Sequence, residues 1–456
     1  MTSRDDRSWR RATVNVEMHH GDYGAQPAGW AVCVERLEER PVIESKARLI
    51  DLRKPVYAKV YEHQPRAIPE GYRPRSTRMI RLHEIDLYVT MRCNLPCHFC
   101  SVRAGEYAHD DIPLERCIEV INEAARLGLE ELHFLGGEPT LRQDLESMIE
   151  CASAHGISTR IITNGLTLTR SRIDRLKNCG LHEIMVSVDG LKAAHTALRG
   201  CGPDGWERTW KCVDDAIASG LVVRVAATAY RDNYDDMVPL LDLSAEHGAD
   251  RFSIFLGSPL GRGHGMMGSV LDPWSWRKLQ EEVSRRTQAM RSTFAVVMEQ
   301  GFAWEDGPQV DRTQLKGRGT GCNTLLEDFD YLIIRSDGNL YQCVFFMTEG
   351  KPIGNVLTAP LEESLLYALD CADYEPFTVP QDKCQTCHHS SECGTGCRGY
   401  AYLYTGDWLR TDPRCSKTEP TDTRTPPYFP LCPILKWNVR TGTFGGSSDQ
   451  ALNADH

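Results

Sequence analysis

Between residues 85 and 257 the sequence alternates short apolar runs with segments of helical periodicity. The runs IDLYVT (85–90) and ELHFLG (131–136) have the length and composition of buried strands, and the segments between such runs carry apolar residues at three- and four-residue steps. Six strand–helix units of this kind predict a parallel sheet with helical crossovers. The number of units suits a partial (β/α)6 TIM-like barrel in an α/β protein better than a closed eight-stranded one.

The other expected strands follow the same pattern, and residues just after parallel strands gather at one end of the sheet, where binding sites form. These strands are expected at 158–165, 182–190, 221–230 and 251–257. The expected helices are 112–129, 141–156, 170–180, 205–220, 236–247 and 272–290.

Composition limits the classes of protein to consider. The chain has 456 residues, of which 41% are hydrophobic and 25% charged, as in soluble proteins of two or three domains. It has neither an apolar run long enough to span a membrane nor an N-terminal signal sequence, so we expect a cytoplasmic protein without a membrane partner. The net charge of −11 argues against nucleic acid as a partner.

Changes in composition predict four segments. Residues 1–82 form an N-terminal extension with strand-like runs, either a module that binds a peptide as an added strand or an extension packed on the barrel. Residues 83–310 hold the barrel and a Gly-rich bridge that begins near residue 257. Residues 311–435 are rich in cysteine, with few expected helices, and residues 436–456 are polar and expected to be a disordered tail.

Eighteen cysteines without a secretion signal point to metal or cluster binding rather than to disulfides. Cys93, Cys97 and Cys100 follow the first expected strand as C-x3-C-x2-C. A [4Fe–4S] cluster has four irons that each need an external ligand. Three thiolates on one short loop would therefore leave one iron open to a substrate or cofactor.

The segment CNLPCHFC resembles the cluster loop of the radical S-adenosylmethionine (SAM) enzymes, C-x3-C-x-aromatic-C, with Phe99 as the aromatic residue. In that family the open iron chelates the amino and carboxylate groups of SAM. Reductive cleavage of SAM then gives a 5′-deoxyadenosyl radical, which abstracts a hydrogen atom from the substrate. The resemblance thus implies an enzyme, a radical SAM oxidoreductase or maturase, but it identifies no general base.

Three further segments resemble the family's SAM contacts. FLGGEPTL resembles the GGEP motif that holds the SAM amino group, and a carboxylate suits an ammonium. MVSVDG resembles the segment that approaches the ribose or the sulfonium, and AHTALRG supplies an arginine for the SAM carboxylate, with a surface ion pair as the alternative. The implied cofactor-binding residues are Gly136, Gly137, Glu138, Pro139, Ser187, Asp189 and Arg199.

The C-terminal cysteines follow a second pattern, C-x15-G-x4-C, then C-x2-C-x5-C-x3-C, then a last cysteine, which is similar to the SPASM domain of radical SAM enzymes. That domain usually holds two auxiliary [4Fe–4S] clusters. The resemblance implies an outer cluster on Cys384, Cys387, Cys393 and Cys415, and an inner one on Cys322, Cys343 and Cys397. The inner cluster would have an open iron or a further ligand, with Cys371 and Cys432 as alternatives, and zinc remains the alternative metal.

The resemblance implies a substrate class and partners. Similar enzymes most often modify ribosomally made peptides by cross-linking or oxidation, and they receive electrons from a flavodoxin- or ferredoxin-like donor. A dehydrogenase or rearrangement enzyme of a sugar, cyclitol or antibiotic pathway is the alternative. A non-catalytic Fe–S or zinc protein is a further alternative, which would explain the cysteines but not the GGEP segment or the barrel.

Overall fold

The computed structural model describes the barrel and parts of the cysteine-rich segment. The described residues are 68–69, 71–74, 80–106, 111–290, 294–298, 329–348, 352–370, 384, 386–387, 396–397, 399–401, 410–412 and 415, with the backbone of 436–438 and 443–445. The N-terminal extension up to residue 67 and the cysteines at 322, 371, 393 and 432 lie outside these residues, so the predictions made for them stay predictions.

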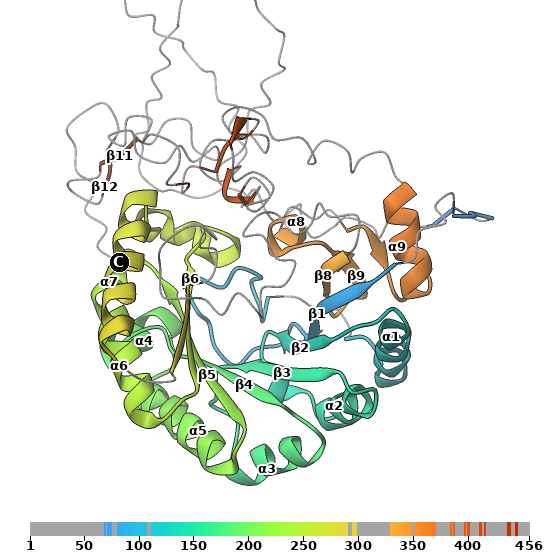
Figure 1. Cartoon of the computed structure of the whole chain (residues 1–456), viewed down its shortest axis with the longest axis horizontal. Coiled ribbons are helices and arrows are strands. Elements are labelled where there is room, and N and C mark those ends of the chain that lie inside the picture. The colour runs from blue at the N-terminus through green and yellow to red at the C-terminus, as the bar shows by residue number, and fades with distance from the viewer. Residues whose placement is uncertain are drawn as a thin grey trace, which may run out of the picture. The chain divides into compact units, whose positions relative to one another are not determined.

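Six parallel strands form the predicted partial barrel and pair in chain order. They are β1 (Leu82–Thr90), β2 (Glu131–Gly136), β3 (Ser158–Thr163), β4 (Glu183–Ser187), β5 (Val222–Ala229) and β6 (Arg251–Leu256). The helices along the outer side of the sheet (Figure 1) include α1 (Leu114–Arg126), α2 (Leu145–Ala154), α3 (Arg170–Asn178), α5 (Gly205–Ser219) and α6 (Met237–His247). The fold class predicted from the alternating pattern is therefore confirmed.

Several elements were not predicted from the sequence. They are α4 (Lys192–Arg199), β7 (Ala295–Met298), and three 3-10 helices, η2 (Pro139–Leu141), η3 (Arg231–Asp236) and η4 (Gly261–Ser269). In contrast, α7 (Pro273–Ala289) matches the helix expected at 272–290. β7 adds a seventh parallel strand beside β6.

The cysteine-rich segment contributes strands to the same sheet. β8 (Phe329–Ile334) pairs in parallel with β1, and β9 (Asn339–Tyr341) and β10 (Gly354–Asn355) continue the sheet in antiparallel pairs. The sheet thus runs across the domain boundary predicted at residue 310. A partial barrel leaves the edge of β1 unpaired, and β8 covers that edge. Two helices, α8 (Val344–Thr348) and α9 (Leu361–Asp370), occur where few were expected.

Two short antiparallel strands, β11 (Lys436–Asn438) and β12 (Thr443–Gly445), lie in the segment for which the sequence predicted only a disordered tail. The aromatic and β-branched residue types in these strands favour extended backbone. The sequence prediction missed these strands because the residues around them are polar. None of the helices in the described part of the chain is long and apolar enough to cross a membrane.

The hydrophobic core lies between the sheet and its helices. Successive side chains of a strand point to opposite faces, so alternate residues of each strand face the helices. Leu87, Phe134, Ile161, Ile184 and Val225 occupy such positions and are each at most 1% exposed. This apolar layer holds the strand ends in place and leaves the other face of the sheet for polar chemistry.

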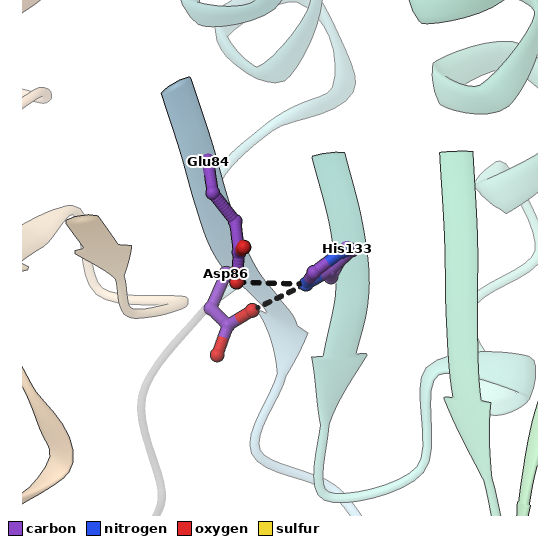
Figure 2. Close-up of side chains that lie close together, drawn as sticks. All are labelled: Glu84, Asp86 and His133. Carbon is purple, nitrogen blue, oxygen red and sulfur yellow. Dashed lines mark hydrogen bonds and ion pairs between the residues drawn. The ribbon is translucent and has the colours of Figure 1, made fainter. Parts of the chain in front are cut away.

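Charged side chains meet on the inner face of the sheet, near the starts of the strands. Figure 2 shows Glu84 and Asp86 of β1 directed toward His133 of β2. The Nδ1 atom of His133 lies 2.9 Å from Oδ1 of Asp86 and 3.4 Å from Oε1 of Glu84. Its Nε2 atom lies 2.9 Å from Nη1 of Arg160, and Glu183 joins Arg160 to the arginines of β5 and β6.

The ionic network favours a proton on His133, because its carboxylates outnumber its guanidinium groups. The network contains the four carboxylates of Glu84, Asp86, Glu131 and Glu183 and the three guanidinium groups of Arg160, Arg224 and Arg251. Burial and the Arg160 guanidinium oppose a charge on His133, but the carboxylates of Asp86, Glu131 and Glu84 outweigh them and raise its pKa to about 9.

This raised pKa predicts how stability changes with pH. Because the pKa of His133 is higher in the folded chain than the ordinary value of 6.5, its contribution is complete below pH 6.5 and is lost as the pH rises to about 9. The wild type should therefore melt at a higher temperature than His133→Gln below pH 6.5, and this difference should shrink as the pH rises to about 9. Each kcal/mol of stabilisation that is lost should lower the wild-type melting temperature by roughly 2–4 °C. Melting curves of both chains from pH 6 to pH 10 measure this, and parallel curves would contradict it.

Candidate active site

The three cysteines lie on a loop that leaves the carboxyl end of β1. Cys97 is buried and Cys93 and Cys100 are half-buried, and none of them forms a disulfide. The loop closes on itself, because the Gly105 amide donates to the Met91 carbonyl over 2.7 Å. This hydrogen bond makes the three-cysteine loop compact.

The three thiols lie near one another, because Cys93 and Cys100 both pack against the small buried cluster that contains Cys97. Burial raises the pKa of Cys93 and raises that of Cys97 to about 11, and the neighbouring Cys100 adds to both increases. The Arg199 guanidinium acts in the opposite direction on both thiols. Cys93 and Cys97, whose raised pKa values make them unfavourable as free anions, lie with Cys100 beside a permanent cation, and this set fits a metal cluster.

The end of β2 braces this loop through its two glycines. The Gly137 amide donates to the Thr90 carbonyl over 2.7 Å, and the Glu138 amide donates to the Arg92 carbonyl over 2.9 Å. A Cβ atom on Gly136 would lie 2.1 Å from the Thr90 carbonyl oxygen, and one on Gly137 would lie 2.2 Å from that of Arg92. Only glycine permits this approach of two backbones, so the GGEP segment has a defined structural task.

The Glu138 carboxylate is buried and already accepts hydrogen bonds within the chain. Its Oε1 atom accepts from the Thr140 amide and hydroxyl and from the Thr163 hydroxyl, and its Oε2 atom accepts from the Asn164 amide over 2.8 Å. Burial raises its pKa, although these donors oppose the increase. Each oxygen of a carboxylate offers about two acceptor positions, and Oε2 uses one of them, so one position on Oε2 remains for a further donor. Pro139 is also buried and begins η2 directly after this residue.

Asp189 and Arg199, which the sequence placed as separate contacts of the cofactor, bind each other. The Arg199 Nε atom donates to Oδ2 of Asp189 over 2.5 Å, and the Thr228 amide donates to Oδ1 over 2.7 Å. The guanidinium lies over the ring of Phe99, 5.6 Å from its centroid, within the three-cysteine loop. Asp189 therefore holds Arg199 beside the loop, whereas Ser187 is half-buried at the end of β4.

Further contacts fix the loop against neighbouring strand ends. The His98 amide donates to the Leu198 carbonyl over 2.9 Å, and Asn164 donates through Nδ2 to Oδ1 of Asn94 over 2.7 Å. A Cβ on Gly200 would lie 3.0 Å from Pro96. The turn after β3 (163–165) and the Arg199–Gly200 pair of the segment AHTALRG are thus both in contact with the loop.

Arg262 is a site residue that sequence reasoning missed. It lies in η4, within the segment interpreted as a Gly-rich bridge, and its side chain donates to the carbonyls of Cys97 and Ala104. Burial opposes its charge, yet the Cys100 thiolate and the Glu106 carboxylate raise its pKa. The signal for it is the segment GRGHG (261–265), which begins five residues after the end of β6, since glycines there indicate a close backbone approach.

Five of the seven predicted auxiliary-cluster cysteines lie within the described residues, namely Cys343, Cys384, Cys387, Cys397 and Cys415. The buried Asp412 links two of them, because its Oδ2 accepts from the Cys397 amide and its carbonyl from the Cys415 amide, each over 3.0 Å. The Cys384 thiol lies 3.6 Å from the hydroxyl of Thr411, the residue before Asp412. These contacts bring together cysteines that the sequence spreads over thirty positions.

Glu84, Asp86 and His133 are metal-ligand residue types whose ligand atoms lie within 4.8 Å of one another. Their atoms already have partners, since the Tyr331 hydroxyl donates to Asp86 over 2.5 Å and both nitrogens of His133 face charged groups. We therefore assign this cluster to the ionic network of the barrel (Figure 2).

Comparisons with known proteins agree with this geometry. A family model described as the radical SAM superfamily matches residues 87–244. The chain is 27% identical over 345 residues to the AdoMet-dependent heme synthase of Nitratidesulfovibrio vulgaris, covering 72% of this chain and 90% of that protein. It is 26% identical over 335 residues to the PqqA peptide cyclase of Ruegeria pomeroyi, covering 72% and 86%.

The fold is also similar to that of SuiB from Streptococcus suis. The crystal structure of SuiB bound to S-adenosylmethionine has a TM-score of 0.61 and 21% identity, covering 74% of this chain and 77% of that one. The structure of SuiB bound to the precursor peptide SuiA has a TM-score of 0.59 and 22% identity, covering 74% and 76%. The barrel therefore contains a radical SAM domain over residues 87–244, the class of domain that uses SAM and a [4Fe–4S] cluster.

The contact of Gly137 with the loop gives a direct prediction. Gly137→Ala should displace the loop, because its Cβ would overlap the Arg92 carbonyl, and overpacking of this kind costs about 1–3 kcal/mol. We expect a lower melting temperature and about tenfold weaker retention of the loop iron. Gly265→Ala is the matched control, since a Cβ there has no atom within 4 Å among the described residues. Equal iron retention in both variants would contradict the role of Gly137.

Proposed function

We propose that this chain is a cytoplasmic radical SAM oxidoreductase or maturase that modifies a ribosomally synthesised peptide. The observation that carries the proposal is the three-cysteine loop, with its thiols brought together by strand ends and the Arg199 guanidinium beside them. Cys93, Cys97 and Cys100 would hold the cluster. When bound, the cluster supplies the electron that cleaves SAM to the 5′-deoxyadenosyl radical.

The residues around the loop suit the two ends of the methionyl part of SAM. The Nε atom of Arg199 donates to Asp189, and this hydrogen bond fixes the orientation of the guanidinium. The two Nη atoms can then bind a carboxylate. The remaining acceptor position on Glu138, or the backbone of the GGEP segment that it fixes, would receive the amino group. We assign Asp189 the task of positioning Arg199, and we keep Ser187 as the candidate contact of the ribose.

The C-terminal cysteines are proposed to hold two auxiliary [4Fe–4S] clusters, as the SPASM pattern implies. The contacts of Asp412 with Cys397 and Cys415 support a compact arrangement of this set. Auxiliary clusters would pass electrons between a flavodoxin- or ferredoxin-like donor and the site. They would also accept one electron from the substrate radical that hydrogen abstraction leaves, which would complete a two-electron oxidation of the substrate.

Two relatives support a peptide substrate. One is named PqqA peptide cyclase, and SuiB has been solved with a precursor peptide bound. A small-molecule substrate is the second candidate, because the heme synthase relative is 27% identical and is covered over 90% of its length. Both candidates use the same cluster and the same SAM contacts, so the substrate has to be decided by experiment.

The reaction class predicts a defined product. The anaerobically reconstituted chain should convert SAM to 5′-deoxyadenosine in the presence of dithionite, as followed by liquid chromatography and mass spectrometry. Cys93→Ala should lower the yield by at least about 100-fold, since removal of a cluster ligand removes the reaction centre. Cys151→Ala is a matched control, because Cys151 lies on α2 away from the loop. Equal yields from the wild type and Cys93→Ala would contradict the assignment.

The substrate class is tested by co-expression. A short peptide encoded beside the gene for this chain should change mass when it is produced together with the wild type but not with Cys93→Ala. An unmodified peptide, together with 5′-deoxyadenosine formation that a heme precursor stimulates, would favour the second candidate instead.

A further inference from the structure

One arginine of η4 holds the cluster loop through an unusual number of contacts. The Nε atom of Arg262 donates to the Cys97 carbonyl over 2.8 Å, and Nη1 donates to the Ala104 carbonyl over 2.9 Å. The backbone amide of Arg262 donates to the Cys100 carbonyl over 2.9 Å. Thus a single residue, 158 to 165 positions away in sequence, binds the backbone of two of the three cysteines and of the loop end.

The surroundings of Arg262 fix it in this position. Its Nη1 atom also pairs with Oε1 of Glu106 at 3.0 Å, and Glu106 pairs with Arg103 of the same loop. Gly261 has a φ of +58°, and a Cβ there would lie 2.4 Å from the Cys100 carbonyl oxygen. The backbone before Arg262 therefore approaches the loop as closely as it can, which requires glycine at 261.

The charge of Arg262 lies beside the thiols and persists at every pH at which the chain is folded. Its Nη2 atom is buried and has no hydrogen-bond partner among the residues that the structure describes. A buried donor of this kind next to the cluster ligands is available to the cluster sulfurs or to a solvent molecule. Hydrogen bonds and charges around the sulfurs are what a protein uses to set the potential of such a cluster.

We propose that Arg262 is a positioning residue for the radical SAM cluster, with two effects. It holds the segment from Cys97 to Ala104 in the conformation that binds iron, and it raises the reduction potential of the cluster by placing a positive charge beside it. The second effect follows because the reduced cluster carries one more negative charge than the oxidised one and is stabilised more by a nearby cation. The proposal rests on the cluster assigned under Proposed function.

Three variants separate the two effects. Arg262→Met removes the charge and the side-chain hydrogen bonds, whereas Arg262→Lys keeps the charge on a single ammonium that cannot span both carbonyls. Arg231→Met is the matched control, because Arg231 has a similar side-chain exposure, 26% against 20%, but pairs with Asp272 rather than with the loop.

The full chain is first reconstituted with iron and sulfide. We then follow the electron paramagnetic resonance signal that changes when SAM is added. This response distinguishes the loop cluster from the auxiliary clusters. Its intensity reports loading, and its titration with potential gives the midpoint. We expect Arg262→Met to lower loading about tenfold and to move the midpoint to a more negative potential. Arg262→Lys should lower loading but keep the wild-type midpoint, and Arg231→Met should match the wild type in both.

Each other outcome has a defined meaning. Wild-type loading and midpoint in Arg262→Met overturn the proposal, and so does an equal loss in Arg231→Met. Lower loading with an unchanged midpoint overturns the effect of the charge. If Arg262→Met does not fold, Arg262→Lys decides, and wild-type loading in that variant overturns the proposal. A wild type without any SAM-sensitive signal would instead defeat the assignment of the loop as the radical SAM cluster.

Discussion

The contact between the end of β2 and the loop after β1 is the constraint on which the site depends. Two consecutive glycines let the β2 backbone approach the Thr90 and Arg92 carbonyls to hydrogen-bond distance. Because Cys93 follows Arg92 directly, this contact fixes where the first thiol of the loop begins. Any side chain at these positions would push the loop away and separate the thiols.

The other strand ends complete the support from different sides. The β3 turn reaches the loop through Asn164 and Asn94, and the Asp189 carboxylate after β4 holds Arg199 over Phe99. The segment after β6 adds Arg262. Each contact comes from the carboxyl end of a strand, so the parallel sheet itself explains why residues distant in sequence act on one loop. The charged side chains nearer the strand starts bind one another and complete the inside of the barrel.

The sequence predicted the parts of this site that are local. The strand at 131–136 and the three cysteines of one loop follow from short-range pattern and spacing, and the structure agrees on the strand's bounds. Contacts between distant residues were not accessible in that way. The pairing of Asp189 with Arg199 depends on how α4 packs, and the position of β8 depends on an edge of β1 about 245 residues earlier. Arg262 was missed because a Gly-rich segment has no periodicity that indicates its contacts.

We propose that Cys93, Cys97 and Cys100 bind a cluster with one iron open to SAM. Mössbauer spectra of the chain reconstituted with ⁵⁷Fe, recorded with and without SAM, test this proposal. We expect one iron subsite to change its isomer shift when SAM is added, and no subsite to do so when the three cysteines are replaced by alanine. Spectra that SAM leaves unchanged in the wild type would contradict it.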